Sequence, residues 1–106
     1  MSERELSFAI VTTPLENAES LAKALVEKRL AACVQVTAPV TSYFWWEDEV
    51  QTEEEVVLFL KTDRQLKQEI EEVLAQLHPY EVPELLFLPI RDGLERYLSW
   101  MGDELR

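Results

Sequence analysis

Apolar and polar positions change period along the chain, and these changes divide it into strands and helices. Residues 6–13 (LSFAIVTT) are short and rich in strand formers, which predicts a first strand. Apolar residues then recur every three or four positions up to about residue 29, which predicts an amphipathic helix; they are Ala18, Leu21, Ala22, Leu25 and Val26. Thr13, Pro14 and Glu16 are spaced as in a capping box, so we expect Thr13 to cap this helix.

Two further strands are expected in the middle of the chain. Residues 32–40 form the second, which continues through residues 43–46 (YFWW) after an interruption at Pro39, because proline has no N–H for a strand ladder. The acidic residues 47–55 should contain the chain reversal, and residues 55–62 (EVVLFLKT) form the third strand.

The last part of the chain repeats the alternation of helix and strand. Thr62 or Asp63 is expected to cap a second helix that ends at His78, since the residue before a proline is driven out of the α region. Residues 85–90 (LLFLPI) predict the fourth strand, and a short helix follows Asp92 and Gly93. The order βαββαβ plus a C-terminal helix predicts an α+β fold, the ferredoxin-like split βαβ sandwich, in a single domain over residues 1–106.

The third and fourth strands carry apolar residues on both faces, at positions 56–60 and 85–88. In this fold both helices cover one sheet face, so the other would be a large exposed apolar patch. We therefore expect a second copy of the chain to cover it. The alternative is that the terminal helix and the long second strand fold back over it. The aromatic residues of the second strand suggest an arm that pairs between subunits, or a cluster that pins its own hairpin; they are Tyr43, Phe44, Trp45 and Trp46.

Composition excludes several classes of function. The 106 residues carry a formal net charge of −11, from 21 acids and 10 bases, which disfavours nucleic acid as a partner. No apolar run approaches the ~20 residues that cross a bilayer, and the first residues do not resemble a signal peptide. A single cysteine cannot build an intrachain disulfide framework. These features together predict a cytoplasmic protein.

His78, the only histidine, is the first candidate for chemistry. It could bind a transition metal or act as a general base, or it could simply bond to the free carbonyls that end a helix. Cys33 is a second candidate metal ligand, or else a small buried apolar residue. A closed metal site of nitrogen and sulfur ligands needs three or four such ligands, and the chain has two. Neither a self-sufficient metal site nor an enzyme is therefore expected.

Charged residues offer two more candidate sites. The acids between residues 47 and 55 lack the spacing of a calcium loop, which favours a solvated hairpin over weak cation binding. Lys61 lies just before the start of the second helix, where backbone N–H groups attract anions. It could help to bind a carboxylate or phosphate, or it could pair with a glutamate.

Five segments, in order along almost the whole chain, resemble the CutA family of divalent cation tolerance proteins; they are KALVEKRLAACVQV (23–36), SYFWW (42–46), EVVLFLKT (55–62), HPYEVPELL (78–86) and YLSWM (97–101). The resemblance implies a ferredoxin-like homotrimer whose sheets pack at the centre, built like the PII signal-transduction proteins, with clefts between subunits. By the same resemblance, the side chains that line such a cleft would be those of Lys61, His78, Tyr80, Glu84 and Trp100.

The function implied by the resemblance is a role in the response to metal ions, with weak binding of divalent cations such as copper and no required cofactor. Two alternatives are a PII-like regulatory trimer that binds a small anionic metabolite, and an assembly scaffold. The chain departs from the family pattern at Phe44, where a tyrosine is common, and at Asp48, where a glycine is common. Val11 and Leu77 replace a cysteine and a histidine implicated in copper binding, so His78 alone remains of that set.

Overall fold

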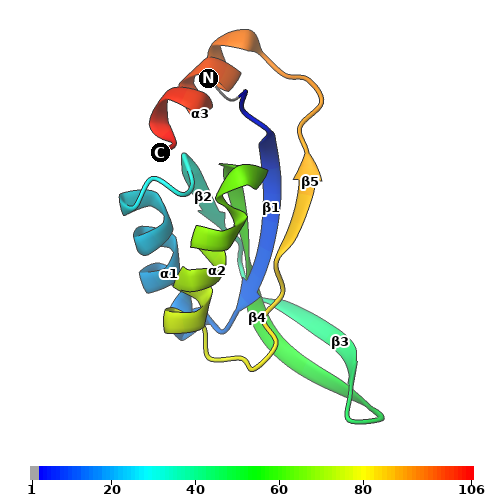
Figure 1. The fold of residues 1–106 in the computed structure, drawn as a ribbon. Coiled ribbons are helices and arrows are strands. Elements are labelled where there is room, and N and C mark those ends of the chain that lie inside the picture. The colour runs from blue at the N-terminus through cyan, green and yellow to red at the C-terminus, as the bar shows by residue number, and fades with distance from the viewer. Residues whose placement is uncertain (1–2) are drawn as a thin grey trace.

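A computed structural model describes residues 3–106 as an antiparallel sheet with two helices on one face (Figure 1). The strands lie in the order β2-β4-β1-β5, and β3 pairs with the outer half of β4. The predicted ferredoxin-like βαββαβ order is thereby confirmed. The elements are β1 (Leu6–Thr13), α1 (Leu15–Glu27), β2 (Cys33–Val36), β3 (Val40–Trp46), β4 (Glu49–Asp63), the short 3-10 helix η1 (Arg64–Leu66), α2 (Lys67–Leu77), β5 (Leu86–Pro89) and α3 (Glu95–Glu104).

The hydrophobic core lies between the sheet and the pair formed by α1 and α2. Alternate residues of β1 and β4 point toward these helices and are fully buried, as strand periodicity requires; examples are Ala9, Val11, Val56, Leu58 and Leu60. The predicted helix stripes meet them, with Leu21, Leu25, Ile70 and Val73 among the buried residues. Both helices therefore cover the same face, as expected.

The opposite side of the sheet, here called the helix-free face, carries apolar side chains that point away from α1 and α2; they are Phe8, Ile10, Val57, Phe59, Leu86 and Leu88. α3 covers only the end of this face near Phe8. Leu86 and Leu88 of β5 remain 55% and 48% exposed. The C-terminal helix thus does not fold back over the whole face.

The start of α1 differs from the prediction. Pro14 is the N-cap residue and no side chain caps the helix. Thr13 belongs to β1, where it lies opposite Val56 and is fully buried, so its side chain is not free to cap. The predicted capping box is therefore wrong.

The end of α1 is a Schellman motif. The N–H groups of Arg29 and Leu30 donate to the carbonyls of Val26 and Leu25, and Arg29 adopts a φ of 58°. The buried side chains of Leu25 and Leu30 supply the apolar contact that usually accompanies this motif.

The predicted second strand is two strands, and the predicted third strand is much longer than expected. β2 ends at Val36, and β3 begins at Val40, after the interruption expected at Pro39. β4 runs through most of the acidic stretch and is 15 residues long. The reversal needs only Glu47 and Asp48, whose φ values of 51° and 63° match a two-residue hairpin loop of the primed type. The hairpin projects beyond the rest of the sheet (Figure 1).

The second helix ends as predicted. Asp63 caps the first turn, η1, by accepting a 2.8 Å hydrogen bond from the N–H of Gln65. α2 stops at Leu77, and His78 takes an extended conformation before Pro79. The predicted fourth strand is present in the shorter form Leu86–Pro89. None of the helices in residues 3–106 is long and apolar enough to cross a membrane.

Candidate functional site: an acidic, aromatic cleft

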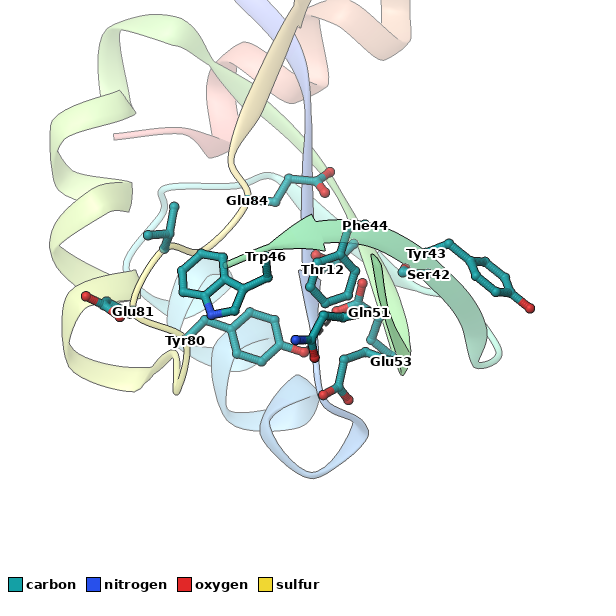
Figure 2. Close-up of a pocket in the computed structure, with 12 residues that line it drawn as sticks. Thr12, Ser42, Tyr43, Phe44, Trp46, Gln51, Glu53, Tyr80, Glu81 and Glu84 are labelled. Carbon is teal, nitrogen blue, oxygen red and sulfur yellow. Dashed lines mark hydrogen bonds between the residues drawn. The ribbon is translucent and has the colours of Figure 1, made fainter. Parts of the chain in front are cut away.

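One face of the β3–β4 hairpin forms a wall of a cleft. Because strand residues alternate between faces, a single set of side chains shares this wall; it consists of Ser42, Phe44, Trp46, Gln51, Glu53 and Glu55. Residues 80–84, after α2, lie against it and enclose a cleft of about 660 Å³ (Figure 2). Phe44 and Trp46 are 38% and 40% exposed, whereas Tyr43 and Trp45 on the opposite face of the hairpin are each 74% exposed.

His78 fixes the loop that closes the cleft. Its Nε2 lies 2.6 Å from the carbonyl oxygen of Thr12, and its Nδ1 accepts a 3.1 Å hydrogen bond from the N–H of Tyr80. A carbonyl only accepts, so Nε2 carries the hydrogen and the ring is the neutral Nε2–H tautomer. His78 is 8% exposed, and its ring packs edge-on to the Tyr80 ring with 4.7 Å between the ring centres.

These contacts bear on the predicted chemistry of His78. A metal ligand or general base needs a ring nitrogen with a free lone pair. Here Nε2 is a donor and the lone pair of Nδ1 accepts from the loop. In this structure His78 therefore positions Tyr80, and ligation of a metal would require one of the two hydrogen bonds to break. The anticipated contact with carbonyls at the end of α2 is replaced by one with a carbonyl of β1.

Glu55 and Tyr80 form the polar centre of the cleft. The Tyr80 hydroxyl donates a 2.9 Å hydrogen bond to Oε1 of Glu55, a residue that is only 7% exposed. Burial, followed by this hydrogen bond and the negative charges of Glu55 and Glu53, raises the pKa of Tyr80 to about 12. Tyr80 is thus held as a neutral donor.

Glu84 completes the acidic character of the cleft. Its pKa is raised by burial and by the charge of Glu55, while the Thr12 side chain opposes the shift by a hydrogen bond. Glu53 and Glu81 also line the cleft, and no lysine or arginine among residues 3–106 does. In Figure 2 Glu84 lies above the Trp46 ring, the carboxylate of Glu81 is turned away from the Trp46 and Tyr80 rings, and Tyr43 points away from the cleft.

Lys61 and Trp100 lie elsewhere in the protomer. Lys61 Nζ donates to Oε1 of Gln35 at 3.1 Å and lies 5.8 Å from the centre of the Tyr97 ring, which packs 5.4 Å from that of Trp100. Lys61 is paired with Phe8, whereas the cleft reaches Thr12, four residues or roughly 13 Å further along β1. Within one protomer the five predicted cleft residues are therefore divided between two ends of the sheet.

One of the two interpretations considered for Lys61, an ion pair with a glutamate, does not describe its surroundings among the described residues. No carboxylate among residues 3–106 lies within 4.0 Å of its ammonium group. The start of the second helix is already occupied by Asp63, which is fully buried and accepts from the N–H groups of Gln65 and Glu5. The N–H groups at the helix start are therefore taken by the chain's own carboxylate, and an anion at Lys61 would depend on the lysine itself.

Cys33 is partly buried and lies directly opposite Lys61 in the β2–β4 ladder. It is thus at the end of the sheet away from His78, whose ring bonds to Thr12. Within residues 3–106 no three histidine, cysteine or acidic side chains are arranged to hold a metal ion.

The sequence of this chain is similar to that of a known protein family. The profile of the family described as CutA1 divalent ion tolerance protein matches residues 7–104. The chain belongs to this family. The Thermus thermophilus divalent-cation tolerance protein CutA is 43% identical over 95 residues, which cover 89% of this chain and 92% of that protein.

Solved structures of CutA1 proteins share the fold. The T. thermophilus divalent cation tolerance protein (Cut A1) superposes with a TM-score of 0.92 at 39% identity, over 95% of this chain and 99% of that one. A PII-like CutA protein from Nostoc sp. PCC 7120 superposes with a TM-score of 0.85 at 32% identity, over 94% and 97% of the two chains. The CutA resemblance seen in the sequence is confirmed.

Glu55 is the cleft residue that sequence reasoning missed. The acids of residues 47–55 were expected to be solvated, but Glu55 is nine-tenths buried. Once the turn is placed at residues 47–48, Gln51, Glu53 and Glu55 alternate on β4 and lie opposite Phe44, Ser42 and Val40, which puts Glu55 on the cleft face.

Proposed function

We propose that this chain is a cytoplasmic homotrimer that takes part in tolerance to divalent cations and catalyses no reaction. The family match carries this proposal, because the related proteins are named for that property. Assembly is supported by the helix-free face, where Leu86 and Leu88 are about half exposed in the protomer.

Two surfaces are proposed to meet in the trimer. The helix-free faces pack near the centre, and the β3–β4 hairpin reaches a neighbouring subunit through Tyr43, Phe44, Trp45 and Trp46. Light scattering tests this directly, with an expected mass three times the 12.4 kDa of one chain. Leu86→Glu places a charge on the face and should give the monomer mass. A monomeric wild-type protein would contradict the proposal.

Divalent cations, copper included, are proposed to associate weakly through carboxylates rather than in a closed site at His78 and Cys33. This is supported by the acidic side chains of the hairpin and cleft and by the occupied nitrogens of His78. Copper titrated by calorimetry should give weak, salt-sensitive binding that Glu53→Gln reduces and Cys33→Ser leaves unchanged. Loss of the heat signal in His78→Ala, with the fold intact by circular dichroism, would instead assign the metal to His78.

A second candidate is a regulatory trimer that binds a small anion at Lys61. It is favoured by the lack of a carboxylate near this ammonium group among residues 3–106, and by the structural likeness to a PII-like protein. A thermal-shift screen of anionic metabolites on wild type and Lys61→Ala tests it. Stabilisation that is the same in both proteins would rule Lys61 out as the anion's partner.

A further inference from the structure

The C-terminal helix α3 has few buried side chains. It follows residues 91–94, which belong to no helix or strand, and it lies at the end of the sheet away from the hairpin (Figure 1). Its buried side chains are Met101 and, just beyond the helix, Leu105. A helix of ten residues is not stable alone in water. The helical form of α3 therefore depends on its contacts with the rest of the protomer.

The C-terminal end of α3 carries charges that oppose a helix. The end of a helix is partly negative, and nearby cations stabilise it. The last turn of α3 has no basic residue and contains Asp103 and Glu104. Its last carbonyls have no partners within the helix, as at every helix end. Positive groups from other segments are therefore required to stabilise this end of α3.

Arg4, from the segment before β1, supplies one of these groups. Its Nη2 donates to the carbonyls of Gly102 and Leu105 at 2.8 and 3.0 Å, and its Nη1 donates to the carbonyl of Arg106 at 3.0 Å. Nη1 also lies 3.6 Å from Oδ2 of Asp63, which is fully buried at the start of the second helix. Arg4 thus joins the end of α3 to a carboxylate fixed in the core.

Arg29, at the end of α1, supplies the second group. Its Nη1 donates to the main-chain and carboxylate oxygens of Glu104, at 3.1 and 2.9 Å. Its carbonyl accepts a 2.9 Å hydrogen bond from the N–H of Arg106. The φ of 58° at Arg29 belongs to the Schellman motif, so the turn that ends α1 also places this side chain. We call the contacts of Arg4 and Arg29 with residues 102–106 the arginine latch.

The helix held by the arginine latch covers one end of the helix-free face. The side chains of Tyr97, Leu98 and Met101 lie over Phe8 and Lys61. The ammonium group of Lys61 is 5.8 Å from the centre of the Tyr97 ring. The position of α3 therefore decides whether this end of the face is covered.

The attachment of α3 is weak compared with that of the sheet. The side chains of Arg29 and Glu104 are 59% and 42% exposed, and ion pairs in water contribute little to stability. Two buried apolar side chains and these exposed contacts hold α3, whereas β4 pairs with β1 and β2 over the core. Elements with few buried contacts open at a lower free energy than the whole domain.

We propose that α3 is a lid that opens as a unit and is held shut by the arginine latch. The helix unfolds when it leaves the sheet, since it is too short to persist alone. Its release uncovers Phe8 and Lys61 while the sheet, α1 and α2 remain folded. This inference goes beyond the proposed function, because it assigns a moving element to the protomer and requires neither a metal nor a particular assembly.

The experiment is amide hydrogen exchange on the wild-type oligomer, resolved by residue. The amides of residues 97–104 should exchange together, at least about tenfold faster than those of residues 56–63 in the sheet. Arg4→Gln should speed the exchange of residues 97–104 about tenfold further. Arg29→Asn should speed it about threefold, and asparagine tolerates the positive φ at this position. Residues 56–63 should exchange at the wild-type rate in Arg29→Asn.

Arg64→Gln is the matched control, because this arginine pairs with Glu5 at 3.1 Å and not with α3. It should leave the exchange of residues 97–104 unchanged, and an effect equal to that of Arg29→Asn would reduce the result to the loss of a positive charge. Exchange of residues 97–104 as slow as that of residues 56–63 in wild type would overturn the proposal, whether the domain or a neighbouring copy fixes the helix. So would equal acceleration of both segments in Arg29→Asn, which leaves the Arg4–Asp63 contact in place.

Discussion

Substitution of Tyr80 by phenylalanine removes one atom from the most tightly coupled pair in the cleft. The hydroxyl of Tyr80 is the hydrogen-bond donor to Glu55 at 2.9 Å, and Glu55 is 93% shielded from solvent in the protomer. The phenylalanine ring keeps the edge-on contact with His78. The substitution therefore isolates the loss of a donor to a buried carboxylate.

The expected cost follows from the state in which Glu55 is left. A hydrogen bond to a charged group contributes about 1.5–3 kcal/mol, and a buried acceptor without a donor also loses its solvation. We expect Tyr80→Phe to lower the free energy of unfolding by about 2 kcal/mol. In a domain of this size that lowers the melting temperature by roughly 8 °C.

Denaturant unfolding followed by far-UV circular dichroism measures the effect, at one fixed protomer concentration so that assembly does not alter the comparison. The matched control is the same substitution in a Glu55→Gln background, where the acceptor is neutral. There the cost should fall to about 1 kcal/mol. Equal costs in both backgrounds, or a change below about 0.5 kcal/mol in wild type, would refute the coupling between Tyr80 and a charged, desolvated Glu55.

Two further substitutions probe other parts of the molecule. Burial and the charge of Glu55 raise the pKa of Glu84 above its ordinary value of 4.5. The protonated form of Glu84 therefore stabilises the fold most fully below pH 4.5, and this contribution is lost as the pH rises through the folded-state pKa. Glu84→Gln should be more stable than wild type by roughly 0.5 kcal/mol at pH 7 and equal to it near pH 4, as urea unfolding at both values can show. A gain that is the same at both pH values would contradict the assignment. Asp63→Ala leaves the N–H groups of Glu5 and Gln65 without their acceptor and removes the partner of Arg4 at 3.6 Å, so it should cost about 3 kcal/mol. Asp63→Asn, which keeps an acceptor oxygen, should cost less, and equal losses would show that the charge rather than the two N–H groups is what matters.

Local patterns in the sequence were sufficient for the elements that face the core. The stripe that includes Leu21 and Leu25 predicted α1, and the dense apolar run of residues 56–60 predicted the inner half of β4. Both elements are stabilised by burying apolar side chains, and the same side chains form the apolar pattern in the sequence. The pattern alone is therefore enough to predict the element. The end of α2 was equally predictable, because Pro79 forbids its continuation.

The outer half of β4 could not be predicted in this way. Residues 49–54 are exposed and polar or acidic, and they are a strand because β3 pairs with them across the two-residue turn. That partner is a non-local feature, and Glu47 and Asp48 do not carry the glycine that usually marks such a turn. With the strand unrecognised, the burial of Glu55 was hidden as well.

The candidate site was only partly foreseen, for a related reason. Tyr80 and Glu84 were named through the family motif, and both line the cleft. The binding role expected of His78 depended on free ring nitrogens, but whether a nitrogen is free is decided by Thr12, which lies 66 positions earlier in the chain. Hydrogen bonds between distant segments leave no trace in residue spacing.

The division of β4 between two sets of partners has a consequence for motion. Residues 56–63 pair with β1 and lie over the core, so their amides should exchange only when the whole domain unfolds. Residues 49–55 pair with β3 alone, and an isolated two-stranded ribbon is marginal in water. The cleft side chains Phe44 and Trp46 are the part of this ribbon that faces the 80–84 loop. Any ligand held between the hairpin and the 80–84 loop would slow amide exchange across the hairpin. The exchange rates of these amides would therefore show whether the cleft is filled.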